Sequence, residues 1–424
     1  MSRALTPQDA HALMNLLVKE ATGQNSTIQT VNSSNFVSAG ETVLATGVEN
    51  TLSSLAIVLG KRFMAVRPYQ AKLRNINAIN SGAYTNRLSK ISYYSREALA
   101  SGDWNTQLFP ENLAAGVDNT SSSVAGHERT ESMWVQNPPI ALEMNFGGSS
   151  VWEDSTTVYK YQLKEAFRSE DSFNSFVAGI MTEKGNDIES QKEAFNHMTL
   201  LNYMAGLYDV NAILSNNMAV NMVTAFNAEN GTSYTAAQLG VGGAYYKEFL
   251  EFFVAYVKKL SKNMEYRTAL RHWTVPKTVN GESHVILRHT PRDKQKVMLY
   301  EPFFIDAKTR VMPEIFNDEY LKLENYEGVM YWQNVNDPMA INVTPAIPDV
   351  AGTASGTQVA GSAVSLSNVL GVIFDSDACM IDYQLEDAES TPLEARKRYY
   401  NMWWSFKKNS INDFTEQGVL LYMA

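Results

Sequence analysis

A long amphipathic stretch between Ser169 and Tyr208 restricts the folds open to this chain more than any other segment. Its apolar residues recur every three or four positions, which places them on one face of an α-helix. They are Phe173, Phe176, Val177, Ile180, Ile188, Phe195, Met198, Leu201, Met204 and Ala205. Ser169 or Asp171 is suited to cap the first turn, because a short side-chain oxygen accepts from the unpaired backbone donors there. One helix of about 37 residues would span roughly 55 Å at 1.5 Å per residue. The alternatives are a kink, or a break into two core helices, at Gly185-Asn186.

The composition is that of a globular chain with a sizeable core. Of its 424 residues 45% are hydrophobic and 19% are charged, and this length favours two or three domains. Neither a signal peptide nor a membrane span is predicted, because no basic N-terminal region precedes an apolar segment and no apolar run reaches about 18 residues. The single cysteine, Cys379, excludes an intrachain disulfide and a cysteine-based zinc cluster, and it fits a reducing cytoplasm. A formal net charge of -10 argues against nucleic-acid binding as the main task.

The charge is unevenly distributed along the chain. The segment from Lys61 to Glu97 has eight basic residues and one acid, whereas Glu301 to Ser390 has fifteen acids and three bases. The basic residues are Lys61, Arg62, Arg67, Lys72, Arg74, Arg87, Lys90 and Arg96. Either two faces of one folded protein differ in charge, or the basic segment of one copy docks on the acidic segment of a neighbour.

The first 160 residues contain two predicted helices, a polar arm between them and a long excursion. Thr6 and Pro7 form a strong helix start, and Gly23 ends that helix. The polar stretch from Gln24 to Gly40 predicts an extended arm, and Glu41 to Met64 predicts a short helix. Two strand-like arms then flank a long Asn-, Ser-, Gly- and Thr-rich run, which is improbable inside a compact domain and indicates an excursion from it. The arms are Ile91–Tyr94 on one side and Met133–Val135 and Ile140–Phe146 on the other.

The second half predicts a mixed helix-and-strand body. An amphipathic helix is expected over Tyr245–Leu260; its Gly240–Gly243 lead-in lacks the Lys-Ser/Thr of a phosphate-binding loop. Further strands are expected, and one of them runs directly into a capped helix start at Thr290-Pro291. The strands are His284–Arg288, Val329–Asn334, and a hairpin of Val369–Phe374 with Cys379–Leu385. Asn336–Asn368 is expected to be a surface loop or small insertion. Asp375 and Asp377 predict a turn in preference to a cation site, because no third ligand has calcium-loop spacing.

The C-terminal residues predict two buried strands. Tyr400, Met402, Trp404 and Phe406 alternate, as one face of a half-buried strand requires, and Gly418–Met423 forms the last strand. The alternative is a single-strand nucleic-acid platform of interleaved basic and aromatic residues. The six histidines are scattered and no catalytic motif is recognised, so we expect neither an enzyme nor a metal or cofactor site.

In this order, the elements resemble the major capsid proteins of tailed bacteriophages that have the Hong Kong 97 fold. The resemblance covers most of the chain, although no single motif is strong. It rests on Tyr159–Phe167 running into Ser172–Val177, on Val66–Tyr69 opening the excursion, and on Tyr399–Trp404 followed by Gly418–Tyr422. Encapsulin compartments share this fold and are the nearest alternative, but they are shorter. A β-rich phage enzyme or binding protein is the alternative from another class.

The resemblance implies an α+β fold with five parts. These are an N-terminal arm (1–60), an extended E-loop (61–160), a peripheral domain with a spine helix (161–208), an axial domain (209–391, with the 336–368 loop) and terminal strands returning to the peripheral domain (392–424). It implies assembly as hexamers and pentamers into an icosahedral head around double-stranded DNA, made in the bacterial cytoplasm. The residues expected at the subunit interface are Arg62, Arg67, Lys72, Arg74, Arg87, Lys90 and Trp134.

The implied partners are other copies, a portal, a separate scaffolding protein, decoration proteins, and packaged DNA through weak contacts. A separate scaffold is expected because only about 60 residues precede the excursion. No Lys and Asn are matched to a covalent crosslink between subunits.

Overall fold

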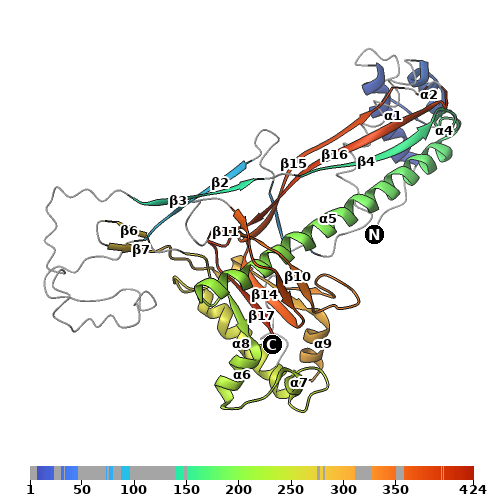
Figure 1. Cartoon of the computed structure of the whole chain (residues 1–424). Coiled ribbons are helices and arrows are strands. Elements are labelled where there is room, and N and C mark those ends of the chain that lie inside the picture. Colours follow the sequence, from blue (N-terminus) through green and yellow to red (C-terminus); the bar gives the residue numbers. More distant parts are fainter. Residues whose placement is uncertain are drawn as a thin grey trace.

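The computed structural model describes residues 7–22, 30–32, 34–45, 73, 76–79, 87–95, 139–147, 150–274, 277–279, 282–310, 326–349, 358–392, 394 and 396–424. In this part of the chain, a long helix runs beside a long sheet (Figure 1). A compact α/β body lies at one end of the helix and two N-terminal helices at the other, while a two-stranded ribbon projects away from the body. No helix among these residues is long and apolar enough to cross a bilayer.

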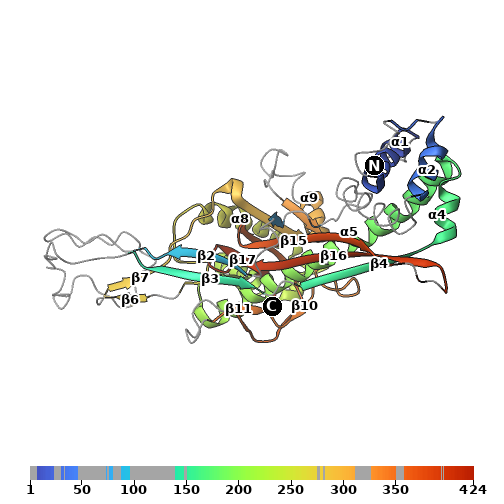
Figure 2. The same cartoon turned by 90° about the horizontal axis from the view of Figure 1, so that it is seen from above.

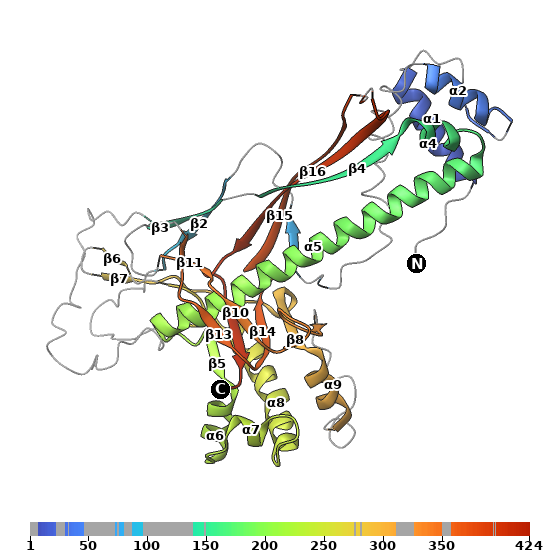
Figure 3. The ribbon, with the colours of Figure 1, turned by 45° about the vertical axis from the view of Figure 1, so that its right-hand side comes forward.

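The long helix, α5, runs from Glu170 to Leu214 without interruption. Its 45 residues correspond to about 67 Å at 1.5 Å per residue. The Ser169 hydroxyl accepts from the Ser172 N–H at 3.2 Å, which confirms Ser169 as the cap. Gly185 is buried within the continuous helix, so the break considered at Gly185-Asn186 is absent. The helix runs alongside the sheet over much of its length (Figure 3).

The long sheet has four strands in the order β1 (Asn77–Ile79), β15 (Cys379–Ser390), β16 (Tyr399–Asn412) and β4 (Ser150–Tyr159). The predicted alternation of β16 is confirmed, because Tyr400, Met402, Trp404 and Phe406 are all buried on one face and cluster with α5 residues such as Phe173 and Ile188. An ion pair of 3.0 Å between Lys184 and Asp154 also joins α5 to β4. A short helix, α4 (Lys160–Ala166), connects β4 to α5.

Two N-terminal helices pack on the outer end of α5. The first helix, α1, spans Pro7–Thr22, where a helix is predicted, while Thr6 and Gly23 lie outside the described residues. The extended arm predicted over Gln24–Gly40 is wrong at its end, because α2 spans Phe36–Ala45. Phe36 meets Phe173 of α5 edge-to-face, with 5.6 Å between ring centroids, so apolar burial against the long helix outweighs the polar composition of this stretch. Of the helix predicted over Glu41–Met64, residues 46–64 lie outside the described residues.

The compact body is built on a five-stranded sheet. Its order is β5 (Ala219–Asn221), β17 (Gly418–Tyr422), β14 (Val369–Asp375), β8 (Gln295–Tyr300) and β9 (Tyr326–Val329). One face packs on α8 (Tyr246–Met264), together with α6 (Met222–Asn230), α7 (Ala236–Leu239) and α9 (Glu301–Arg310). The other face packs on the C-terminal half of α5. The helix predicted over Tyr245–Leu260 and the closing strand at Gly418 are confirmed.

Several local predictions in the body are wrong. β14 and β15 do not form a hairpin, since each belongs to a different sheet. The helix start predicted at Thr290-Pro291 yields only a 3-10 turn (Arg292–Lys294), because β8 follows at once. The expected strand at His284–Arg288 is shifted, and β7 (Glu282–His284) pairs with β6 (Lys277–Val279). The strand expected at Val329–Asn334 ends at Val329.

The described residues of the 336–368 segment, 336–349 and 358–368, form a small folded insertion, which was one of the two expected alternatives. Two strand pairs are present, β10 (Ile341–Val343) with β13 (Val364–Leu366) and β11 (Ala346–Pro348) with β12 (Gln358–Ala360). Their buried side chains Ile341 and Ile347 join the core around α5. Asn202 of α5 also accepts from the Ala346 N–H at 2.8 Å, so the insertion is fixed to the helix.

The projecting ribbon consists of β2 (Arg87–Tyr93) and β3 (Ala141–Gly147), which are antiparallel (Figure 2). It confirms the predicted pair of arms, although Met133–Val135 lies outside the described residues. One face of the ribbon is buried at its base through Met144 and Phe146. The opposite face exposes Ile91 and Tyr93, which are 59% and 61% exposed. The ribbon is thus anchored on one face, and the other face combines the exposed Ile91 and Tyr93 with polar residues such as Ser89 and Glu143.

Candidate assembly site at the base of the ribbon

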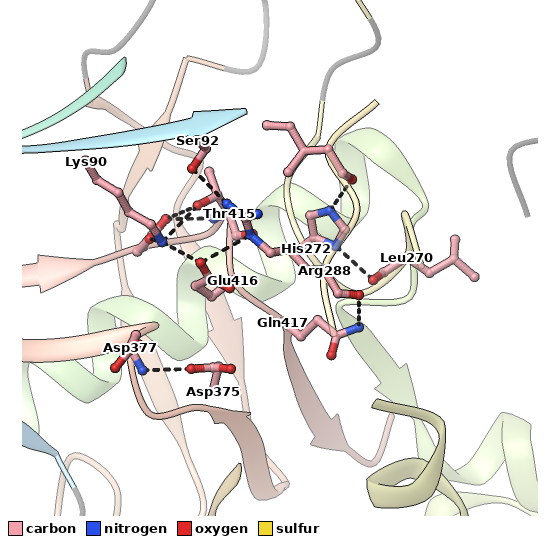
Figure 4. A network of polar contacts seen from close by, with 12 residues as sticks. Lys90, Ser92, Leu270, His272, Arg288, Asp375, Asp377, Thr415, Glu416 and Gln417 are labelled. Carbon is pink, nitrogen blue, oxygen red and sulfur yellow. Dashed lines mark hydrogen bonds and ion pairs between the residues drawn. The ribbon is translucent and has the colours of Figure 1, made fainter. Parts of the chain in front are cut away.

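A network of charged residues fixes the ribbon where it leaves the body (Figure 4). The Lys90 ammonium, on the inner face of β2, lies between the carboxylates of Asp413 and Glu416 in the loop that joins β16 to β17. Its distance to Glu416 is 2.5 Å. Strand β2 is therefore tied directly to the C-terminal part of the chain.

Arg288 supplies a second link between the same elements. Its Nη2 donates to the Ser92 hydroxyl of β2 at 2.7 Å, and its Nε lies 3.2 Å from Glu416 and 3.2 Å from the Thr415 carbonyl oxygen. The guanidinium has several donors in a fixed plane, so it holds two segments in one relative orientation better than a flexible ammonium does. Arg288 thus sets the position of the ribbon against the β16–β17 loop.

The loop itself is pre-shaped to receive these cations. Asp413 is fully buried, and its Oδ1 accepts from the Thr415 N–H at 2.9 Å and from the Thr415 hydroxyl at 2.6 Å. Phe414 stacks on Tyr203 of α5, with 5.4 Å between ring centroids. A Cβ on Gly206 would overlap the Phe414 ring, so the glycine makes room for it. The loop is rigid because it is packed on the long helix.

A buried histidine supports Arg288 from the other side. The ring of His272 lies between the carbonyl oxygens of Leu270 and Ile286, at 3.0 and 2.8 Å (Figure 4). Burial lowers its pKa from 6.5 to about 4, and the charge of Arg288 acts in the same direction. The imidazole is therefore neutral at physiological pH, and it braces the segment that carries Arg288.

The network is balanced in charge and holds its cation firmly. Lys90 and Arg288 face Asp413 and Glu416, two cations and two anions. Burial alone would lower the pKa of Lys90, but the two carboxylates outweigh it, so its pKa is raised above 10.5. Removal of one partner would leave a poorly hydrated charge, which is costly. The arrangement is that of a structural clamp.

Comparison with known families identifies the chain. The model of the family described as Phi29-like phage major capsid protein matches residues 14–421. The chain belongs to this family. The expected major capsid protein of the Hong Kong 97 fold is thereby confirmed, and the clamp is the root of the projecting ribbon of a capsid protein.

Solved phage capsids are similar to this capsid protein at low sequence identity. The capsid structure of Staphylococcus phage Andhra has 10% identity and a TM-score of 0.46, and the alignment covers 84% of this chain and 88% of the other. That of cyanophage P-SCSP1u has 11% identity and a TM-score of 0.42, covering 83% and 87%. The mature capsid of bacteriophage PhiM1 has 8% identity and a TM-score of 0.42, covering 84% and 88%. No curated protein sequence matches the chain.

The interface residues predicted for this capsid protein fall in three groups. Arg62, Arg67, Lys72, Arg74 and Trp134 lie outside the described residues. Arg87 is the first residue of β2, and its interface role stays a prediction. Lys90 forms ion pairs within its own chain, and its role at the subunit interface also stays a prediction.

Sequence reasoning missed Asp413, Glu416 and Arg288. The available signal was the largely polar stretch between Lys408 and Gly418, for which the sequence analysis makes no prediction. Asp375 and Asp377 do form the predicted turn, because the Asp377 N–H donates to Asp375 Oδ1 at 2.9 Å. Burial raises the pKa of the Asp375 carboxyl.

Proposed function

We propose that the capsid protein assembles as hexamers and pentamers into an icosahedral head around double-stranded DNA, with its ribbon laid over a neighbouring subunit. The observation that carries this proposal is the two-faced ribbon. Its inner face is clamped by Lys90 and Arg288, and its outer face exposes Ile91 and Tyr93. Two large exposed apolar side chains on a projecting ribbon fit burial against another copy.

We further infer a structural role without catalysis, synthesis in the bacterial cytoplasm, and assembly with a portal, a separate scaffolding protein and decoration proteins. Contact with packaged DNA would be weak, because the chain carries a formal net charge of -10. The family match favours this reading over an encapsulin-like compartment or a β-rich phage enzyme. The five-part domain division by residue number remains part of the same proposal.

The test is electron microscopy of particles formed with the natural partners. The double variant Ile91→Asp, Tyr93→Asp would remain folded as a subunit but fail to form closed shells, because two charges would be buried at the interface. The matched control, Ile91→Leu with Tyr93→Phe, keeps both side chains apolar and would assemble. Normal shells from the aspartate variant would contradict docking through this face.

A further inference from the structure

Strand β4 lies at an edge of the long sheet. It pairs along ten residues with β16, from Ser150 opposite Lys408 to Tyr159 opposite Tyr399, without any shift in register. Its other side has no partner strand among the described residues, and it is the outermost strand of the sheet in Figure 2. This edge is long, regular and open.

Alternate residues of β4 direct their backbone groups to the open side. The Ser155 N–H donates to Asp154 Oδ1 at 2.8 Å, and the Tyr159 N–H donates to Gln162 Oε1 at 3.2 Å. In an antiparallel sheet, the backbone N–H and C=O groups of residues two apart in a strand point toward the same neighbouring strand. Thr157 stands between these two residues, so its N–H and carbonyl also face the open side.

The open edge of β4 has few of the sequence and structural features that prevent another strand from pairing with it. Soluble proteins protect such edges with Pro, Lys, bulges or short strands. β4 contains neither Pro nor Lys, and residues of high β-propensity fill most of it (SVWEDSTTVY). Val151 is 61% exposed, and Trp403 is 40% exposed on the adjoining β16. In a protein whose copies assemble into a shell, such an edge is expected to be covered by another strand.

Charge favours one occupant. β4 carries the acids Glu153 and Asp154 and no base, whereas β2 carries the bases Arg87 and Lys90 and no acid. Opposite charges attract in cross-strand positions, and like charges repel. In the described part of the chain, β2 pairs with no strand other than β3, so its second edge is open from Arg87 to Tyr93, up to the bridge that Ser95 forms with Val285 on that side. Asp154 and Lys90 already have partners in their own chain, so Glu153 is the acid of β4 that is available to a neighbouring strand.

We propose that the open edge of β4 pairs with strand β2 of a second copy, so that the ribbon of one subunit extends the long sheet of the next. The inference rests on the proposed docking of the ribbon and names its receptor. Each copy then offers a donor strand and an acceptor edge, which is a head-to-tail contact. Such contacts close into rings when the rotation between copies permits.

The test is photocrosslinking in assembled shells, with p-benzoylphenylalanine at position 157. We expect a crosslinked subunit dimer whose second peptide comes from residues 87–96. The matched control carries the probe at position 156, whose side chain points to the opposite face and would crosslink within its own chain. Shells in which position 157 reacts only within its own chain, or with another segment of a second copy, would overturn the strand pairing. Failure of the wild-type protein to form shells would instead overturn the proposed function.

A backbone variant separates strand pairing from side-chain contact. Thr157→Pro removes the outward N–H, and proline is tolerated at edge positions whose N–H does not bond within the sheet. We expect folded subunits with at least a tenfold lower yield of shells. Thr157→Val retains the N–H and removes the 2.7 Å hydrogen bond from the hydroxyl to Asn401, and it should assemble normally. Equal yields from the two variants would contradict a role for the backbone at this edge.

Discussion

Replacement of Lys90 by methionine tests the clamp at the base of the ribbon. The variant keeps most of the side-chain volume but leaves Asp413 and Glu416 with Arg288 as their one remaining cation in the network. Breaking a fully buried ion pair costs about 3 to 5 kcal/mol. The Lys90 side chain is 29% exposed, so water screens part of the interaction, and we expect a loss of about 2 to 3 kcal/mol.

The assay is urea unfolding of unassembled subunits, followed by tryptophan fluorescence. Lys19→Met, at an exposed position near the end of α1, is the matched control and should change stability by less than about 0.5 kcal/mol. Adding Asp413→Asn to Lys90→Met should cost less than the sum of the single changes, because the two groups interact directly. Equal losses for Lys90→Met and Lys19→Met would refute the assignment of Lys90 to a buried clamp.

Three further substitutions test the surroundings of the clamp. The pKa of His272 is about 4 in the folded state, whereas its ordinary value is 6.5. As the pH falls from 6.5 to 4, His272 therefore takes up a proton in the unfolded chain before it does so in the folded protein, and the free energy of unfolding decreases by about 3 kcal/mol. In urea titrations across that range, His272→Gln should lose less stability than wild type, and equal slopes would contradict this reasoning. The buried Tyr203 hydroxyl has no hydrogen-bond partner among the described residues, so Tyr203→Phe should leave thermal stability unchanged or raise it by about 1 kcal/mol, and a clear loss would reveal an unrecognised bond. Gly206→Ala should destabilise by more than about 2 kcal/mol in urea unfolding, because its methyl group would collide with Phe414, whereas a gain would show that the ring moves freely.

The long helix was predictable because its signals are local. The cap at Ser169 and the apolar spacing that follows lie within the segment itself, and both agree with the structure. The break considered at Gly185 was not a reliable prediction, because a glycine destabilises a helix by only about 1 kcal/mol and the packing of the helix against the sheet outweighs this. Local propensity therefore marked where the helix begins but gave no reliable sign of a break.

The turn at Asp375 shows where local reasoning stops. The turn was predicted correctly because it depends on a local contact, in which the Asp375 carboxylate accepts from the N–H of Asp377, two residues later. The strands on either side join different sheets, and that choice depends on partners far away in the sequence. The clamp was missed for the same reason, since Lys90 and Asp413 are 323 positions apart and no periodicity connects them.

Strand β16 gives the molecule a direction in which it resists force. It is paired on both sides, with β15 over eleven residue pairs and with β4 over ten, and it continues through residues 413–417 into β17 at the centre of the compact body. Hydrogen bonds of an antiparallel ladder lie perpendicular to the strands, so tension along β16 loads all of them together in shear. Tension across the sheet would instead open them one after another. A subunit stretched along β16 within a shell would therefore be pulled in the direction in which it is stiffest. The packed Asp413–Gln417 loop would transmit the force between the two sheets.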